Sequence, residues 1–167
     1  MFGWQYTLFF HLIAAATWLG SMLFFVFVLV PYGKKYMERE EYVTFLNDIG
    51  MKYRKLGWVC LITIAITGII LSDIISGWGA FMVRDGHSDP PASTIAWKMV
   101  GGAVLFLLAA LHDFKYGPRA IALWDEVGDT EDSRKARRRA TNFGRINLIL
   151  SIIIFWLGIT VVRGSPF

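Results

Sequence analysis

Long apolar stretches alternate along the chain with shorter segments that carry most of the charged residues. Four stretches approach or exceed about 20 residues, the length that a helix needs to cross a hydrocarbon layer of about 30 Å. They cover about residues 7–30, 56–75, 92–112 and 146–162. Only Asp73, near the end of the second, and Lys98, in the third, place a charged side chain in them. The pattern predicts an all-α integral membrane four-helix bundle that forms a single domain over residues 1–167.

The composition agrees with a membrane bundle and excludes other classes of protein. Hydrophobic residues make up 55% of the chain and charged residues 18%, whereas a soluble domain is about one quarter charged. The single cysteine, Cys60, excludes an internal disulfide, a CxxC redox pair and a thiolate-rich zinc site. The first stretch lacks a basic start and is longer than the apolar part of a signal peptide, so we expect it to be retained.

Lysine and arginine gather in two of the three connections, and such an excess marks the cytoplasmic side. The first connection holds six of them and the third holds eight, whereas the second holds only Arg84. We therefore predict two cytoplasmic basic loops, both termini outside, and a multi-pass protein of the cell (inner) membrane. The basic run 134–139 is expected to touch anionic lipid head groups. The lipid bilayer is therefore an expected partner. Nucleic acid is not expected, because the acidic stretch 125–132 beside the basic run would repel its phosphates.

Proline-containing segments of similar composition follow the first and third stretches. They read Pro31-Tyr32-Gly33-Lys34 and Tyr116-Gly117-Pro118-Arg119. They predict that each helical hairpin turns into the cytoplasm through a similar break, and they are compatible with two parallel hairpin repeats. In the first basic loop, Tyr42, Phe45, Leu46 and Ile49 recur at helical spacing, which predicts a short interfacial helix.

Ionisable side chains at membrane depth are costly, so His11, Lys98 and His112 are the candidates for function. The first and third stretches run in the same direction, side by side in the expected bundle, which places His11 and Lys98 at similar depth near the outer surface. His112 follows Lys98 by fourteen residues, about 21 Å along a helix. The sequence therefore predicts one site that contains His11 and Lys98, and it argues against one iron held by both histidines.

Each candidate can also be explained by a structural role that involves no ligand. The imidazole of His11 could form an interhelical hydrogen bond to a threonine or a backbone carbonyl. The ammonium of Lys98 could reach the outer head groups from beside Trp97, and His112 could pair with the adjacent Asp113. In the outer loop, His87 together with Asp85 and Asp89 could bind a divalent cation or form a solvated turn.

Helical periodicity places small residues beside two of these candidates. One stripe contains His11, Ala14, Ala15, Trp18 and Met22, and another contains Lys98, Gly101, Gly102, Leu105, Ala109 and His112. Small residues on facing stripes either let helices pack closely or leave space for a flat ligand. The sequence leaves both interpretations open.

Several short motifs resemble a known family of membrane proteins. They are His11–Gly20 (HLIAAATWLG), Pro31, Trp97-Lys98, His112-Asp113-Phe114 and Gly117-Pro118-Arg119. Together they resemble the CopD-like (copper-resistance D) four-helix membrane proteins, a superfamily that includes the HemJ-type protoporphyrinogen oxidase.

The resemblance implies a heme b site, with His11 as the iron ligand and Lys98 beside a propionate or as a second ligand. Gly101 and Gly102 would admit the porphyrin, and Trp18 and Met22 would line the pocket. The expected function is electron transfer, or oxidation of a lipophilic or porphyrin-like substrate by a heme-dependent oxidoreductase.

Two other functions and several partners stay open. One function is a copper or divalent-ion permease that uses His87 and His11. The other is a non-catalytic accessory subunit of a membrane redox complex. A quinone or another membrane redox partner, a second copy of the chain and subunits of a larger complex are the open partners, and His112 is a candidate ligand of a second heme.

Overall fold

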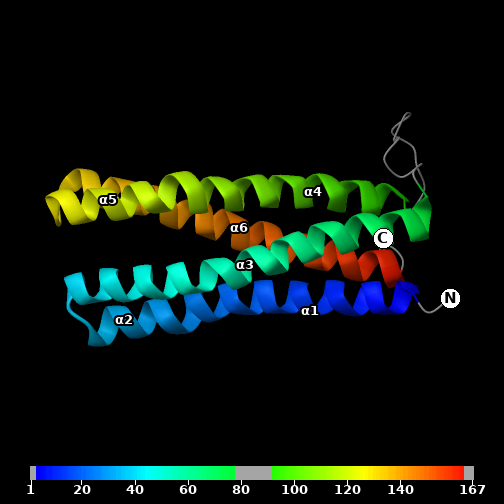
Figure 1. Cartoon of the computed structure of the whole chain (residues 1–167), viewed down its shortest axis with the longest axis horizontal. Helices are drawn as coiled ribbons and strands as arrows, with labels where there is room; N and C mark the ends of the chain where they lie inside the picture. Colours follow the sequence, from blue (N-terminus) through cyan, green and yellow to red (C-terminus); the bar gives the residue numbers. More distant parts are fainter. Residues whose placement is uncertain (1–2, 78–91, 164–167) are drawn as a thin grey trace.

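The computed structural model describes residues 3–77 and 92–163, and these residues are helical apart from short connections. The α-helices are α1 (Gly3–Phe24), α2 (Val30–Tyr36), α3 (Arg39–Ser76), α4 (Ala92–Leu111), α5 (Gly117–Val127) and α6 (Glu131–Arg163), with π-helical turns η1 (Phe25–Leu29) and η3 (His112–Tyr116). These elements form four long helical rods, and Figure 1 shows how they are arranged. The all-α prediction is confirmed for the described residues.

Each rod contains a segment long and apolar enough to cross a membrane, so the chain is a multi-pass membrane protein. The first rod joins α1, η1 and α2, the third joins α4, η3 and α5, and α3 and α6 are single helices. The 38 residues of α3 extend about 57 Å, well beyond a hydrocarbon core of about 30 Å. Figure 1 shows α2 and α5 at one end of the bundle and the start of α1 with the end of α6 at the other. We call the first of these the basic end; it consists of residues 30–55 and 115–145.

The rods pack in the order first, second, third, fourth around the bundle. α1 lies mainly against α3, α4 lies mainly against α6, and smaller contacts join α1 to α6 and α3 to α4. α1 and α4 are therefore diagonal, and the prediction that the first and third spans lie side by side is wrong. In the middle of the bundle, the buried Leu61, Leu105 and Ala109 form an apolar layer together with Trp18, Leu150 and Ile154.

The helices continue through both proline segments, so the predicted breaks are wrong. A proline ring collides with the carbonyl four residues earlier and lacks an N–H to bond it. For Pro31 that carbonyl belongs to Phe27, inside η1, and for Pro118 it belongs to Phe114, inside η3. The wider π turn removes the collision without ending the rod.

The two π turns occupy equivalent places in the two hairpins. The interval from His11 to the start of η1 equals the interval from Lys98 to the start of η3, and each π turn is followed at the same distance by its proline. The shared arrangement of a π turn followed by a proline supports the interpretation of the chain as two hairpin repeats. The predicted interfacial helix around Tyr42 is not a separate element, because these residues form the first turns of α3.

Gly33 lets α2 approach α3 closely. A Cβ at Gly33 would lie 2.5 Å from Cδ2 and 2.9 Å from Cε2 of Tyr42, whereas a Cβ at Gly50 of α3 would meet no atom within 4 Å. Both glycines are helical, so an alanine gains similar helix propensity at either position. Gly33→Ala should therefore be less stable than Gly50→Ala by about 1–3 kcal/mol, the usual cost of overpacking. Unfolding titrations of the two variants in detergent measure this difference, and equal stabilities would contradict the close approach.

Asp129 links the two hairpins at the basic end. Its carboxylate accepts hydrogen bonds of 2.9 Å from both Nε and Nη2 of Arg134, and Nη2 of Arg39 at the start of α3 lies 2.9 Å away. The hydrogen bonds from Arg134 hold the pKa of Asp129 below its usual value, and the charges of Arg39 and Arg137 act in the same direction.

A carboxyl group with a depressed folded-state pKa stabilises the fold above its unfolded pKa and loses this effect as the pH falls through the folded pKa. The wild type should therefore be more stable than Asp129→Asn by a constant margin near neutral pH. This margin should shrink below about pH 4. Melting temperatures between pH 3 and 7 test this, with Asp132→Asn as the control. A margin that is the same at every pH would count against the link.

Candidate functional site

The imidazole of His11 is held by a threonine of the neighbouring helix. Its Nδ1 lies 2.8 Å from the hydroxyl oxygen of Thr67, and that hydroxyl donates its own hydrogen to the carbonyl of Thr63. Because that hydroxyl donates to a carbonyl, the Nδ1–H tautomer of His11 satisfies both groups, and in that tautomer Nε2 carries a lone pair. The interhelical hydrogen bond predicted as the structural interpretation of His11 is present, and its Nδ1–H tautomer is the one in which Nε2 can bind a metal.

Glycines provide the space for both polar side chains. A Cβ at Gly68 of α3 would lie 3.4 Å from Cε1 of His11, and a Cβ at Gly158 of α6 would lie 3.2 Å from Nζ of Lys98. His11 and Lys98 are both half-buried. These two glycines therefore let each polar side chain lie close to the backbone of the adjacent rod.

His11 and Lys98 lie at the same depth, as the sequence predicts. The indole N–H of Trp18 donates to Ser151 at 3.2 Å, which aligns α1 with the antiparallel α6 at this level. His11 lies seven residues from Trp18 toward the start of α1. Gly158 lies seven residues from Ser151 toward the end of α6, at the same end of the bundle, and its Cα is close to the amine of Lys98. We call His11, Thr67, Gly68, Lys98 and Gly158 the His11 layer.

The other residues predicted to surround a porphyrin are more dispersed. Trp18 and Met22 both contact Ser151, with the Met22 sulfur 3.9 Å from its hydroxyl, so they lie at least seven residues, or about 10 Å, from His11 along the bundle. A Cβ at Gly101 would lie 3.1 Å from Ile154, whereas Gly102 has open space. Of the two glycines predicted to admit the porphyrin, only Gly102 has open space, and Trp18 belongs to the apolar layer.

A second polar cluster surrounds Asp113 in η3. Its carboxylate lies 2.9 Å from Nδ1 of His112 and accepts a hydrogen bond of 2.9 Å from the indole N–H of Trp58. The guanidinium of Arg54 donates to the backbone carbonyl of Asp113, with its Nε 4.0 Å from the carboxylate. We call Arg54, Trp58, His112 and Asp113 the Asp113 cluster. The predicted pairing of His112 with Asp113 is present, far from His11.

Sequence reasoning missed the roles of Arg54 and Trp58. Arg54 is one of many basic residues in a loop, and Trp58 has the position of an ordinary interfacial aromatic. Both are more than fifty residues from Asp113, so no local pattern reveals the contact. His87, Asp85 and Asp89 lie outside the described residues, and the residues within 3–77 and 92–163 contain no group of three potential His, Cys, Asp or Glu ligands of a metal ion.

Residues 13–129 match the model of a family described as "Domain of unknown function (DUF4149)". The chain belongs to the DUF4149 family. The matched segment contains Lys98, His112 and Asp113, and it begins two residues after His11. A relative from Aquifex aeolicus (strain VF5), named "Uncharacterized protein", is 26% identical over 160 residues, which is 94% of each chain. No solved structure matches. Neither match carries a functional name, so the CopD-like resemblance of this DUF4149 protein stays a prediction.

The Asp113 cluster should contribute to stability. Asp113→Ala would leave the side chains of Trp58 and His112 without their acceptor; both are only partly buried, so the loss is that of an ordinary hydrogen bond, about 0.5–1.5 kcal/mol. We expect a loss of about this size in detergent unfolding experiments. Asp48→Ala, which changes an exposed carboxylate of α3, should have little effect. A similar loss in both variants would mean that the cluster is not specific.

Proposed function

We propose that this DUF4149 protein is a membrane-embedded b-type heme protein for electron transfer or oxidation of a lipophilic or porphyrin-like substrate. The observation that supports it best is the hydrogen bond between Nδ1 of His11 and Thr67, because in the Nδ1–H tautomer Nε2 would be the ligand atom inside the bundle. A neutral imidazole is a suitable axial ligand of heme iron. When bound, a heme would supply one-electron chemistry.

The residues at this depth fit such a group in their chemistry. Thr67 would fix the ring of His11 and raise its basicity as a ligand. The amine of Lys98 would neutralise a propionate or a substrate carboxylate, and Gly102 would provide room for a flat ring. Ile154, which covers Gly101, would have to turn its flexible side chain aside.

We also propose that the basic end faces the cytoplasm and that both termini face the outside of the cell membrane. The excess of lysine and arginine in residues 30–55 and 115–145 supports this orientation. The His11 layer would then lie near the outer surface, where a lipophilic substrate or a quinone could reach it through the outer leaflet.

An accessory role in a larger membrane complex is the second candidate. A groove of about 310 Å³ between α4 and α6, lined by Trp97, Val100, Gly101, Leu150, Ile153, Ile154 and Leu157, is open and almost entirely apolar. It could receive a helix of a partner subunit, and copurification of such a subunit would support this role.

A permease has less support, because Leu61, Leu105 and Ala109 form an apolar layer between the two polar regions.

Absorption spectra of the purified protein test the heme proposal. Protein produced with a heme supply should show a Soret band, and its reduced-minus-oxidised spectrum should show an α band. His11→Ala should abolish both bands, and Thr67→Val should lower the heme affinity about 10–100-fold, as expected for a residue that orients a ligand. His112→Ala is the matched control and should retain the spectrum. Absence of heme from the wild type in a pyridine hemochrome assay, or an unchanged spectrum in His11→Ala, would overturn the proposal.

A further inference from the structure

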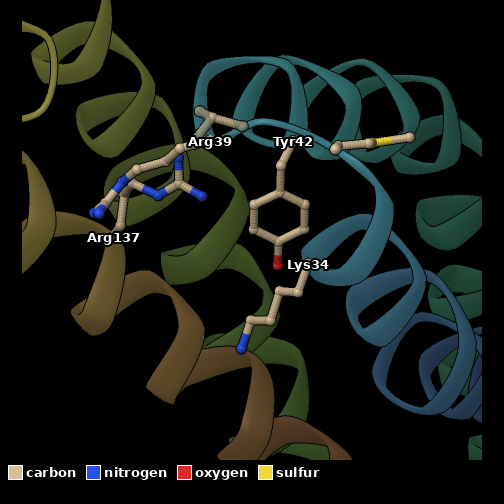
Figure 2. A pocket seen from close by; sticks show the side chains of 6 residues that line it. Lys34, Arg39, Tyr42 and Arg137 are labelled. Atoms are coloured by element: carbon tan, nitrogen blue, oxygen red, sulfur yellow. The ribbon is translucent and has the colours of Figure 1, made fainter.

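The basic end contains a cavity where the two hairpins meet. It has a volume of about 350 Å³ and is lined by Lys34, Met37, Arg39, Tyr42, Val43 and Arg137. Figure 2 shows that the side chains of Lys34, Tyr42 and Arg137 reach this space from three different helices. The lining contains three cationic side chains and no carboxylate. The cavity is therefore a concentrated positive environment formed by α2, α3 and α6.

Arg137 has an unused donor at this cavity. Its Nη1 is buried and has no hydrogen-bond partner among the residues that the structure describes. The guanidinium lies over the ring of Trp124, 5.1 Å from the ring centroid, which supports one face of the group. An unpaired buried donor costs free energy, and native structures rarely leave one without a partner. The geometry thus favours an acceptor that enters the cavity.

The acidic residue nearby pairs with only one of the three cations that line the cavity. Asp129 is already bound by Arg39 and Arg134, and among the described residues neither Lys34 nor Arg137 forms an ion pair. Of the acidic stretch 125–132, Asp129 is thus held in a local pair by the two arginines, which leaves the charges of Lys34 and Arg137 at the cavity.

We propose that this cavity binds a phosphate group, with Arg137 and Lys34 as its cationic partners and the hydroxyl of Tyr42 as a further donor. A guanidinium presents several N–H donors in a planar fork that matches phosphate oxygens, and such charge-assisted hydrogen bonds are stronger than neutral ones. The volume is near the lower end of ligand pockets, which begin at about 300 Å³. It suits inorganic phosphate or the phosphate end of a small phosphomonoester.

A phosphate group could come from a soluble anion or from a lipid head group. Arg137 precedes the apolar stretch that begins at Ile146 by nine residues, about 13 Å along α6. The polar zone on each side of a bilayer is only about 5–8 Å thick. This distance favours a soluble phosphate, although Lys34 lies closer to the apolar part of its rod.

Two binding experiments with the full chain distinguish these sources. In the first, the protein in phosphatidylcholine nanodiscs is titrated calorimetrically with inorganic phosphate and with glycerol 3-phosphate. In the second, its melting temperature is compared in nanodiscs with and without phosphatidic acid. Binding in the titration indicates a soluble ligand, and stabilisation only by phosphatidic acid indicates a lipid head group; either supports a phosphate site if the variants below behave as expected.

Matched variants decide whether the cavity is responsible. Arg137→Gln should weaken binding at least tenfold, whereas Arg138→Gln, an exposed neighbour outside the cavity with the same change of charge, should bind like the wild type. Lys34→Gln and its neighbour Lys35→Gln form a second pair that stays decisive if Arg137→Gln fails to fold. Equal effects within both pairs, or no response of the wild type in either experiment, would overturn the proposal.

Discussion

Polar groups inside a membrane bundle have few partners other than one another, and this constraint organises the interior of the protein. Water cannot satisfy a polar group at that depth, so each one must bond within the bundle. His11 therefore bonds Thr67, Trp18 bonds Ser151, and Trp58 bonds the carboxylate of Asp113. Each of these bonds joins two different rods. Together they fix the alignment of helices whose apolar faces would otherwise slide easily along one another.

The bonds of His11 and of Asp113 lie on opposite sides of an apolar layer, and the bond between Trp18 and Ser151 lies at the level of that layer. His11 and Lys98 occupy one side, the Asp113 cluster occupies the other, and Leu61, Leu105 and Ala109 fill the space between them. Under the proposed function, the chemistry would be confined to the side of this layer that holds His11. The separation also explains why the two histidines have different surroundings, since His11 meets a hydroxyl and His112 meets a carboxylate.

In both hairpins the first helical rod continues from the apolar part to the basic end through the same local structure. A π turn precedes a proline in each, and the rod continues as a helix. This continuity carries α2, α3, α5 and α6 beyond the apolar stretches as one packed extension. The cationic cavity depends on that extension, since Lys34 lies on α2 beyond Pro31 and Arg137 packs over Trp124 of α5 beyond Pro118.

The sequence by itself determined the helical class, the four apolar spans and the common depth of His11 and Lys98. These follow from length, hydropathy and rise per residue, which depend on neighbouring residues along one chain. The tertiary structure decided that α1 and α4 are diagonal, that Thr67 and Gly68 receive His11, and that Arg54 and Trp58 converge on Asp113. Apolar helices present similar surfaces to lipid and to each other, so periodicity identifies a face but not the partner that covers it. The identity of that partner is set by side-chain packing and by hydrogen bonds between residues far apart in the chain.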